Sequence, residues 1–139
     1  MSENVVPVRV LVVEDESLIA LNLSELLLDL GYGVIGPFAT SHMAKLAADL
    51  DLPDAAIVDL NLMDGKTGLD LAHHLVRSFR TTVVIATANP EDVRAAPFIV
   101  LRKPYTDKAV EDALRQAVLT RTGERALSID TKPRVESGV

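Results

Sequence analysis

The sequence predicts an α/β fold in which a doubly wound parallel sheet has helices on both faces. Short apolar runs alternate with helical segments along most of the 139 residues. These runs are almost continuously apolar, as expected of strands whose two faces are both covered by helices. Strands separated by helices pair in parallel through right-handed crossovers. A hydrophobic content of 48% and a length that suits one domain provide enough apolar surface for such a core.

The first half of the predicted fold consists of two strands, each followed by a helix. The first strand is a β-branched apolar run that ends at acidic residues, which open the first helix. Gly31 ends that helix, and Thr40 or Ser41 can cap the next one through a side-chain oxygen. The predicted ranges are residues 8–13 (strand), 14–30 (helix), 34–38 (strand) and 41–50 (helix).

The second half contains three more strands. Pro53 and Asp54 break the chain before the third strand, and Gly65 and Gly68 mark the loop after it. Few residues remain between the fourth and fifth strands, and two of them are prolines, so the helix expected there is short or missing. The predicted ranges are strands 55–59, 82–86 and 98–101, a third helix ending near residue 77, and a last helix at 107–119.

These elements predict a flavodoxin-like, five-stranded sheet in the order 2-1-3-4-5. We expect residues 1–7 to be a short lead and residues 8–120 to be the folded domain. Residues 121–139 are polar and contain Gly123, Pro133 and Gly138. We therefore expect that segment to be a loose, flexible C-terminal tail.

Composition argues against several classes of function. The net charge is -6 and no dense basic run occurs, so we expect no direct contact with nucleic acid. The chain has no cysteine, which excludes disulfides and thiol chemistry. Its apolar stretches are too short for membrane insertion, and the first residues do not resemble a signal peptide. The expected location is the cytoplasm.

Chemically active side chains follow the carboxyl ends of the predicted strands, where ligands bind in such sheets. Clustered carboxylates repel one another unless a cation neutralises them, and Mg2+ suits a site that also receives phosphate. A metal beside a lysine forms a clamp for phosphoryl oxygens, and a carboxylate can itself attack phosphorus. Asp59 ends the central strand and is the best candidate for that nucleophile. The residues in question are Glu14, Asp15, Asp59, Thr87 and Lys103.

Four segments together resemble the receiver domains of two-component response regulators. The resemblance covers residues 8–119 and includes an acidic pair, a phosphoacceptor strand, a hydroxyl segment and a lysine–proline–aromatic signature. Each segment alone is weak, but all four occur in order at the expected strand ends. They are Leu11-Val12-Val13-Glu14-Asp15-Glu16, Ile57-Val58-Asp59-Leu60-Asn61-Leu62, Ile85-Ala86-Thr87-Ala88 and Leu101-Arg102-Lys103-Pro104-Tyr105.

The resemblance implies a role for each matching residue. Asp59 would accept a phosphoryl group from a sensor histidine kinase or a histidine phosphotransfer protein. Mg2+ would be bound by Asp15, Asp59 and the backbone carbonyl of Asn61, with Glu14 acting through a water molecule. Such a domain catalyses only its own phosphorylation and dephosphorylation.

The same resemblance implies how the phosphate is held. Thr87 would donate a hydrogen bond to one phosphoryl oxygen, and Lys103 would pair with another. Pro104 would hold the lysine loop, in this family often through a cis peptide bond. Asn61 and Asn89 stand at the positions that tune how quickly the phosphate is lost to water.

The sequence also departs from the usual receiver pattern. The loop after Asp59 lacks the common proline, and Val100 occupies the switch position, where most receivers have an aromatic residue. With the shortened fourth helix, these departures resemble the divergent alphaproteobacterial receivers called the FATGUY type. Of that motif, the chain contains Ala86-Thr87.

The output predicted for the chain is a protein contact or the passing on of phosphate, as a relay or sink, because no helix-turn-helix pattern follows the last helix. On the first helix, Leu21 and Leu28 lie opposite the stripe predicted to face the core, which comprises Ile19, Leu23, Leu26 and Leu30. The two leucines could dock a kinase, form a homodimer contact, or be scattered surface residues.

Three other functions remain open from the sequence alone. A flavodoxin-type cofactor binder would need a Ser/Thr/Gly-rich loop after the first strand, where this chain is acidic. A Mg2+-dependent phosphatase would usually place its nucleophile after the first strand rather than the third. A degenerate receiver would bind a partner without being phosphorylated, but the intact set of Asp59, Thr87 and Lys103 argues against it.

Overall fold

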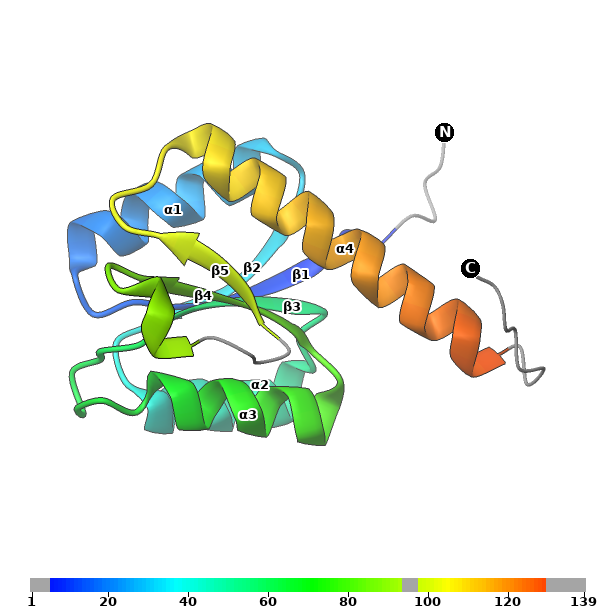
Figure 1. Cartoon of the computed structure of the whole chain (residues 1–139), viewed down its shortest axis with the longest axis horizontal. Helices are drawn as coiled ribbons and strands as arrows, with labels where there is room; N and C mark the ends of the chain where they lie inside the picture. Colours follow the sequence, from blue (N-terminus) through cyan, green and yellow to red (C-terminus); the bar gives the residue numbers. More distant parts are fainter. Residues whose placement is uncertain (1–5, 94–97, 130–139) are drawn as a thin grey trace.

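The computed structural model describes residues 6–93 and 98–129 and contains a five-stranded parallel sheet between two layers of helices (Figure 1). The strand order is β2-β1-β3-β4-β5, so the predicted fold class and strand order are confirmed. The strands are β1 (Arg9–Val13), β2 (Gly33–Phe38), β3 (Ala55–Asp59), β4 (Thr82–Thr87) and β5 (Ile99–Arg102). The helices are α1 (Ser17–Asp29), α2 (Ser41–Asp51), α3 (Gly68–Phe79) and α4 (Asp107–Ile129).

Two hydrophobic cores lie on the two faces of the sheet. Figure 1 shows α1 and α4 on one face and α2 and α3 on the other. Alternate residues of β1 point to opposite faces, so Leu11 packs in the core under α2 and α3, and Val12 packs in the core under α1 and α4. Both side chains are fully buried. Each such side chain stabilises the fold by about 1.5–3 kcal/mol through the hydrophobic effect.

The connection between β4 and β5 is short, as predicted. A single 3-10 turn, η1 (Pro90–Val93), occupies the place of a full helix. Val93 is buried in the core shared with α2 and α3, so this turn is attached to the fold by packing. Residues 94–97 lie outside the described residues.

The last helix is longer than predicted. We expected it to end near residue 119 and to be followed by a loose tail, but α4 continues to Ile129. Arg121 explains part of this extension: its guanidinium pairs with Asp54 Oδ1 at 3.2 Å and donates to the Arg80 carbonyl oxygen at 3.0 Å. No proline interrupts residues 120–129, and one Gly in a helix costs only about 1 kcal/mol. The remaining tail, residues 130–139, lies outside the described residues.

The buried face of α1 also differs from the prediction. It is formed by Ala20, Leu23, Ser24 and Leu27, whereas Ile19, Leu26 and Leu30 are only half-buried. The prediction counted only hydrophobic residues as core-facing, and it therefore left out Ser24, which faces the sheet. Its hydroxyl donates to the Ala20 carbonyl oxygen at 2.8 Å, which satisfies the polar group inside the core. Leu21 and Leu28 are exposed, at 53% and 58%.

Among the described residues, no helix combines the length and the apolar character needed to cross a bilayer.

Candidate functional site

The carboxyl ends of the strands bring the predicted site residues to one edge of the sheet. Asp59 is the last residue of β3, and its neighbour across the ladder is Ala86, directly before Thr87 at the end of β4. Lys103 follows β5, and its backbone N–H donates to the Thr87 carbonyl oxygen at 2.9 Å. Glu14 and Asp15 follow β1, the neighbour of β3 on its other side.

Three carboxylates form a compact acidic cluster. One oxygen each from Glu14, Asp15 and Asp59 lies within 4.8 Å of the others. Glu14 and Asp59 are buried, at 5% and 6% exposure. An all-oxygen donor set of this size and charge fits a hard divalent cation such as Mg2+. Without such a cation, carboxylates this close repel one another, and a nearby lysine can offset part of that repulsion.

Lys103 supplies the nearest positive charge. Its Nζ lies 2.5 Å from Asp59 Oδ2 and 3.5 Å from Glu14 Oε1. Partial burial lowers the pKa of Lys103, but the hydrogen bond and the charge of Asp59, with that of Glu14, outweigh burial and raise the pKa overall. The lysine is therefore a permanent cation that bridges the two buried carboxylates.

Glu14 is the titratable group that its surroundings shift furthest. Burial raises the pKa of Glu14 to about 7, and the nearby Asp59 adds to the rise. The backbone N–H of Glu16, 3.0 Å from Glu14 Oε2, and the charge of Lys103 oppose it. Glu14 is therefore a carboxyl that readily takes up a proton near neutral pH unless further positive charge enters the site.

Backbone N–H groups at the rim orient the side-chain oxygens of Asp59 and Thr87. The N–H of Asn61 donates to Asp59 Oδ1 at 3.2 Å, and the N–H of Asn89 donates to Thr87 Oγ1 at 3.0 Å. Because the Thr87 oxygen accepts that bond, its own O–H points elsewhere and can serve as a donor. Asn61 and Asn89 are both exposed at this rim. The Lys103–Pro104 peptide bond is cis, as the resemblance implied.

Gly68 has a role that the sequence reading missed. It is the first residue of α3, and its N–H donates to the Leu60 carbonyl oxygen at 3.1 Å. A Cβ atom at Gly68 would collide with the carbonyl oxygen of Asp59 and lie 2.7 Å from Cα of Leu60. Only glycine therefore lets α3 begin directly against the backbone of Asp59. A glycine at the end of this loop was the available signal, but the pattern indicated only a turn.

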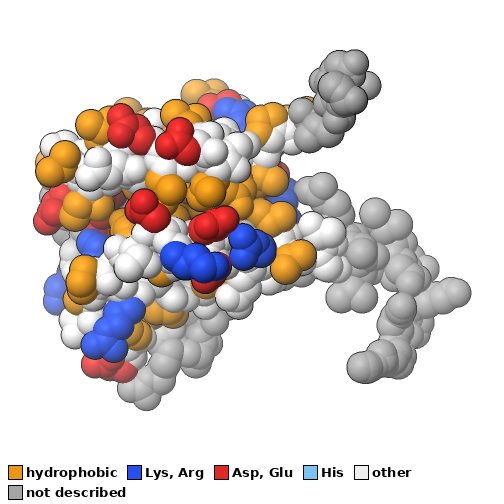
Figure 2. All heavy atoms as spheres, turned by 90° about the horizontal axis from the view of Figure 1, so that it is seen from above, with side chains coloured by type: hydrophobic (Ala, Val, Ile, Leu, Met, Phe, Trp, Pro, Cys, Tyr) orange, Lys and Arg blue, Asp and Glu red, His pale blue; other side chains and the backbone are white. Residues whose placement is uncertain are grey.

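The predicted switch residue and the predicted docking leucines are not part of the acidic cluster. Val100 in β5 is 38% exposed. Leu21 and Leu28 lie on α1, together with Leu18, a third exposed leucine that the sequence reading did not include. Figure 2 shows hydrophobic side chains in a band across the face formed by α1 and α4, with acidic and basic side chains beside it.

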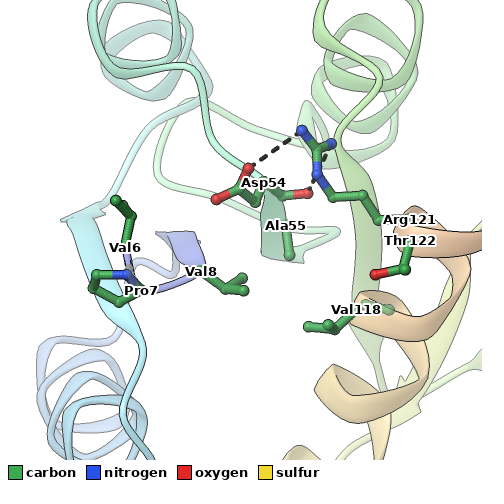
Figure 3. A pocket seen from close by; sticks show the side chains of 9 residues that line it. Val6, Pro7, Val8, Asp54, Ala55, Val118, Arg121 and Thr122 are labelled. Atoms are coloured by element: carbon green, nitrogen blue, oxygen red, sulfur yellow. Dashed lines mark hydrogen bonds and ion pairs between the residues drawn. The ribbon is translucent and has the colours of Figure 1, made fainter. Parts of the chain in front are cut away.

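A cavity of about 290 Å³ lies at the opposite edge of the sheet. Figure 3 shows it between the residues that precede β1 and the middle of α4, with the Asp54–Arg121 ion pair on one side. Asp54 precedes β3, so the cavity is at the amino ends of the strands, a full strand length from Asp59. The carboxyl edge, not this cavity, is where the titratable groups gather.

The family of the chain follows from comparison with known proteins. Residues 10–115 match the model of the response regulator receiver domain. The chain belongs to the response regulator receiver family. This membership confirms the predicted resemblance to receiver domains. The narrower FATGUY assignment stays a prediction.

The curated relatives that the chain matches are longer regulators. The chain is 33% identical over 122 residues to the phyllosphere-induced regulator PhyR of Methylorubrum extorquens, covering 84% of this chain and 46% of PhyR. It is 31% identical to the transcriptional regulatory protein PdtaR of Mycobacterium tuberculosis, covering 81% of this chain and 58% of PdtaR. The crystal structure of PhyR from Brucella abortus superposes with a TM-score of 0.81 at 25% identity, covering 91% of this chain and 53% of that one. The chain thus spans about half the length of the curated relatives it matches.

Proposed function

We propose that the receiver accepts a phosphoryl group on Asp59 from a sensor histidine kinase or a histidine phosphotransfer protein. The observation that carries the proposal is the buried Asp59 carboxylate, which shares one cluster with Glu14 and Asp15 and is paired with Lys103. In the transfer, a carboxylate oxygen of Asp59 attacks phosphorus while the bond between phosphorus and the donor's imidazole nitrogen breaks. The electron pair of that bond returns to the imidazole.

The acidic cluster supports Mg2+ as the cofactor. Asp15, Asp59 and the backbone carbonyl of Asn61 would hold the ion directly, and Glu14 would hold it through a water molecule. Bound Mg2+ supplies positive charge that neutralises the incoming phosphoryl oxygens. The same charge favours the carboxylate form of Glu14, whose burial otherwise favours the protonated form.

Lys103 and Thr87 would hold the transferred group. Lys103 pairs with Asp59 Oδ2, so its ammonium is already beside the carboxylate that would carry the phosphoryl group. The free O–H of Thr87 would donate to a second phosphoryl oxygen. Asn61 and Asn89, both exposed at the rim, would tune the attack of water on the acyl phosphate.

The partner surface and the location follow from the same role. We assign Leu21 and Leu28 to kinase docking, because they are exposed on α1, whose N-terminus adjoins the acidic pair. The alternative to kinase docking is that a second copy of the chain binds this face in a homodimer. Output would be a protein contact or a phosphate relay or sink, in the cytoplasm. Val100 leaves the usual aromatic switch position without a ring.

Phosphorylation by a small donor tests the proposal. Acetyl phosphate with Mg2+ should add one phosphoryl group to the wild type, seen by intact-mass spectrometry, and none to Asp59→Asn. The control Asp70→Asn, an exposed carboxylate in the first turn of α3, should keep the adduct. An adduct that survives in Asp59→Asn contradicts the assignment. A folded wild type without any adduct favours a degenerate receiver that binds its partner unphosphorylated.

A further inference from the structure

The loop after the acceptor residue is held by hydrogen bonds more than by packing. We call residues 60–67, which join β3 to α3, the acceptor loop. Leu62 is its one buried residue, while Asn61, Met63 and Asp64 are exposed. A segment with so little buried apolar surface opens easily unless polar contacts restrain it. The position of Asn61 therefore depends on where the hydrogen bonds of this loop are anchored.

Asp64 anchors this loop by accepting three hydrogen bonds. Its Oδ1 accepts from the backbone N–H of Ser41 at 3.1 Å and from the hydroxyl of Thr67 at 2.8 Å. Its Oδ2 accepts from the N–H of His42 at 3.3 Å. Ser41 and His42 are the first two residues of α2, whose N–H groups have no partner within the helix. The carboxylate of one loop thus caps a helix that begins more than twenty residues earlier in the chain.

The electrostatics of this contact favour the ionised carboxylate. The N-terminus of a helix carries partial positive charge, which stabilises an anion there. The hydrogen bond from Ser41 N–H lowers the pKa of Asp64, and those from Thr67 and His42 lower it further. The anchor is therefore intact at neutral pH.

Backbone hydrogen bonds connect the turn around Asp64 to the position of Asn61. Leu62 and Gly65 exchange two backbone hydrogen bonds of 2.9 Å, which close the loop into a rigid turn around Asp64. Met63 N–H donates to the Ala39 carbonyl oxygen at 3.0 Å, beside the same helix end. Asn61 precedes this turn and is bonded through its N–H to Asp59 Oδ1. A shift of the turn would thus move the Asn61 peptide relative to the acceptor carboxylate.

We propose that Asp64 is a positioning residue for the divalent-metal site, because it ties the acceptor loop to the N-terminus of α2 and so holds the Asn61 carbonyl beside Asp59. The inference rests on the proposed function, in which that carbonyl is a metal ligand. Residues that orient a ligand without touching the metal typically change metal affinity by about 10–100-fold when they are removed. For one backbone ligand among several, the lower end of that range applies.

Mg2+ titrations of the full chain, followed by amide chemical shifts in NMR spectra, test the inference. Asp64→Ala should raise the Kd for Mg2+ about tenfold relative to wild type. Asp64→Asn, which keeps one acceptor oxygen for Ser41 and Thr67, should recover part of the affinity. Asp49→Ala is the matched control, because it removes an exposed carboxylate of α2 outside the loop and should leave the Kd unchanged. Urea unfolding of each variant reports its stability separately.

The outcomes separate this inference from the proposed function. A wild type with no saturable shifts around Asp59 would overturn the proposed metal site itself. A wild type that binds, with a folded Asp64→Ala of equal affinity, would overturn the inference and leave the metal site standing. A lower urea midpoint with an unchanged Kd would make Asp64 only a helix cap, which also overturns it. If Asp49→Ala weakened Mg2+ binding equally, the effect would come from the loss of negative charge, which would overturn the inference. If Asp64→Ala does not fold, the Kd of Asp64→Asn decides.

Discussion

Replacing Glu14 by Gln should change how the stability of the metal-free protein depends on pH. Burial holds the folded-state pKa of Glu14 at about 7, against an ordinary value of 4.5. A raised carboxyl pKa contributes stability that is fully present below pH 4.5 and is lost as the pH rises to about 7. The difference of 2.5 pKa units (7 − 4.5) corresponds to about 3 kcal/mol, at roughly 1.36 kcal/mol per unit.

The assay is urea unfolding in EDTA, followed by circular dichroism between pH 4.5 and 8. Wild type should lose up to about 3 kcal/mol of unfolding free energy over this range relative to Glu14→Gln, whose amide does not titrate. The control Glu25→Gln removes an exposed carboxylate from α1 and should follow the wild-type profile. Parallel profiles for wild type and Glu14→Gln would refute the claim that burial raises the pKa of Glu14 in the metal-free protein.

Mg2+ should reverse this pH dependence in the wild type. Metal binding favours deprotonated carboxylates and therefore releases protons where they are still bound. Saturating Mg2+ should stabilise the wild type more at pH 8 than at pH 5. The gain should depend less on pH in Glu14→Gln, which has no proton to release.

Two further predictions concern Gly68 and the proposed docking face. Gly68→Ala should lower the unfolding free energy by about 2 kcal/mol or more. Its Cβ would clash with backbone atoms of Asp59 and Leu60, which cannot relieve the clash by a change of rotamer. Gly123→Ala in α4, with no described atom within 4 Å of the new Cβ, should be neutral or slightly stabilising in the same urea titration. Leu21→Glu should slow phosphotransfer from the cognate kinase while leaving phosphorylation by acetyl phosphate unchanged. Equal kinase rates for Leu21→Glu and wild type would remove the docking role of α1.

The site residues that sequence reasoning found share one property. Asp59 ends β3 and Lys103 follows β5, and the parallel arrangement of the strands alone places their side chains at one edge. The fold class follows similarly from the alternation of apolar runs and helices. These features depend on side-chain type and order, which a sequence displays directly.

The features that the sequence did not reveal depend on backbone groups or on single side-chain rotations. Asp64 binds the N–H groups of Ser41 and His42, which no side-chain pattern reports. The extension of α4 depends in part on Arg121 reaching the Arg80 carbonyl oxygen, again a backbone contact between distant segments. The face of α1 was misplaced because the Ser24 hydroxyl bonds within its own helix and thus behaves as a core residue.

The charge around Asp59 and the position of its backbone and loop are controlled by different parts of the fold. Glu14 and Lys103, which set the charge around Asp59, follow β1 and β5, on either side of it. Gly68, which lies against the backbone of Asp59, and Asp64, which ties the acceptor loop to α2, belong to the segment that runs from β3 into α3. Variants in separate networks should combine additively, and variants within one network should not. Glu14→Gln combined with Asp64→Asn should therefore change Mg2+ affinity by the product of the two single effects. A strongly non-additive pair would mean that the acceptor loop moves when the charge of Glu14 changes.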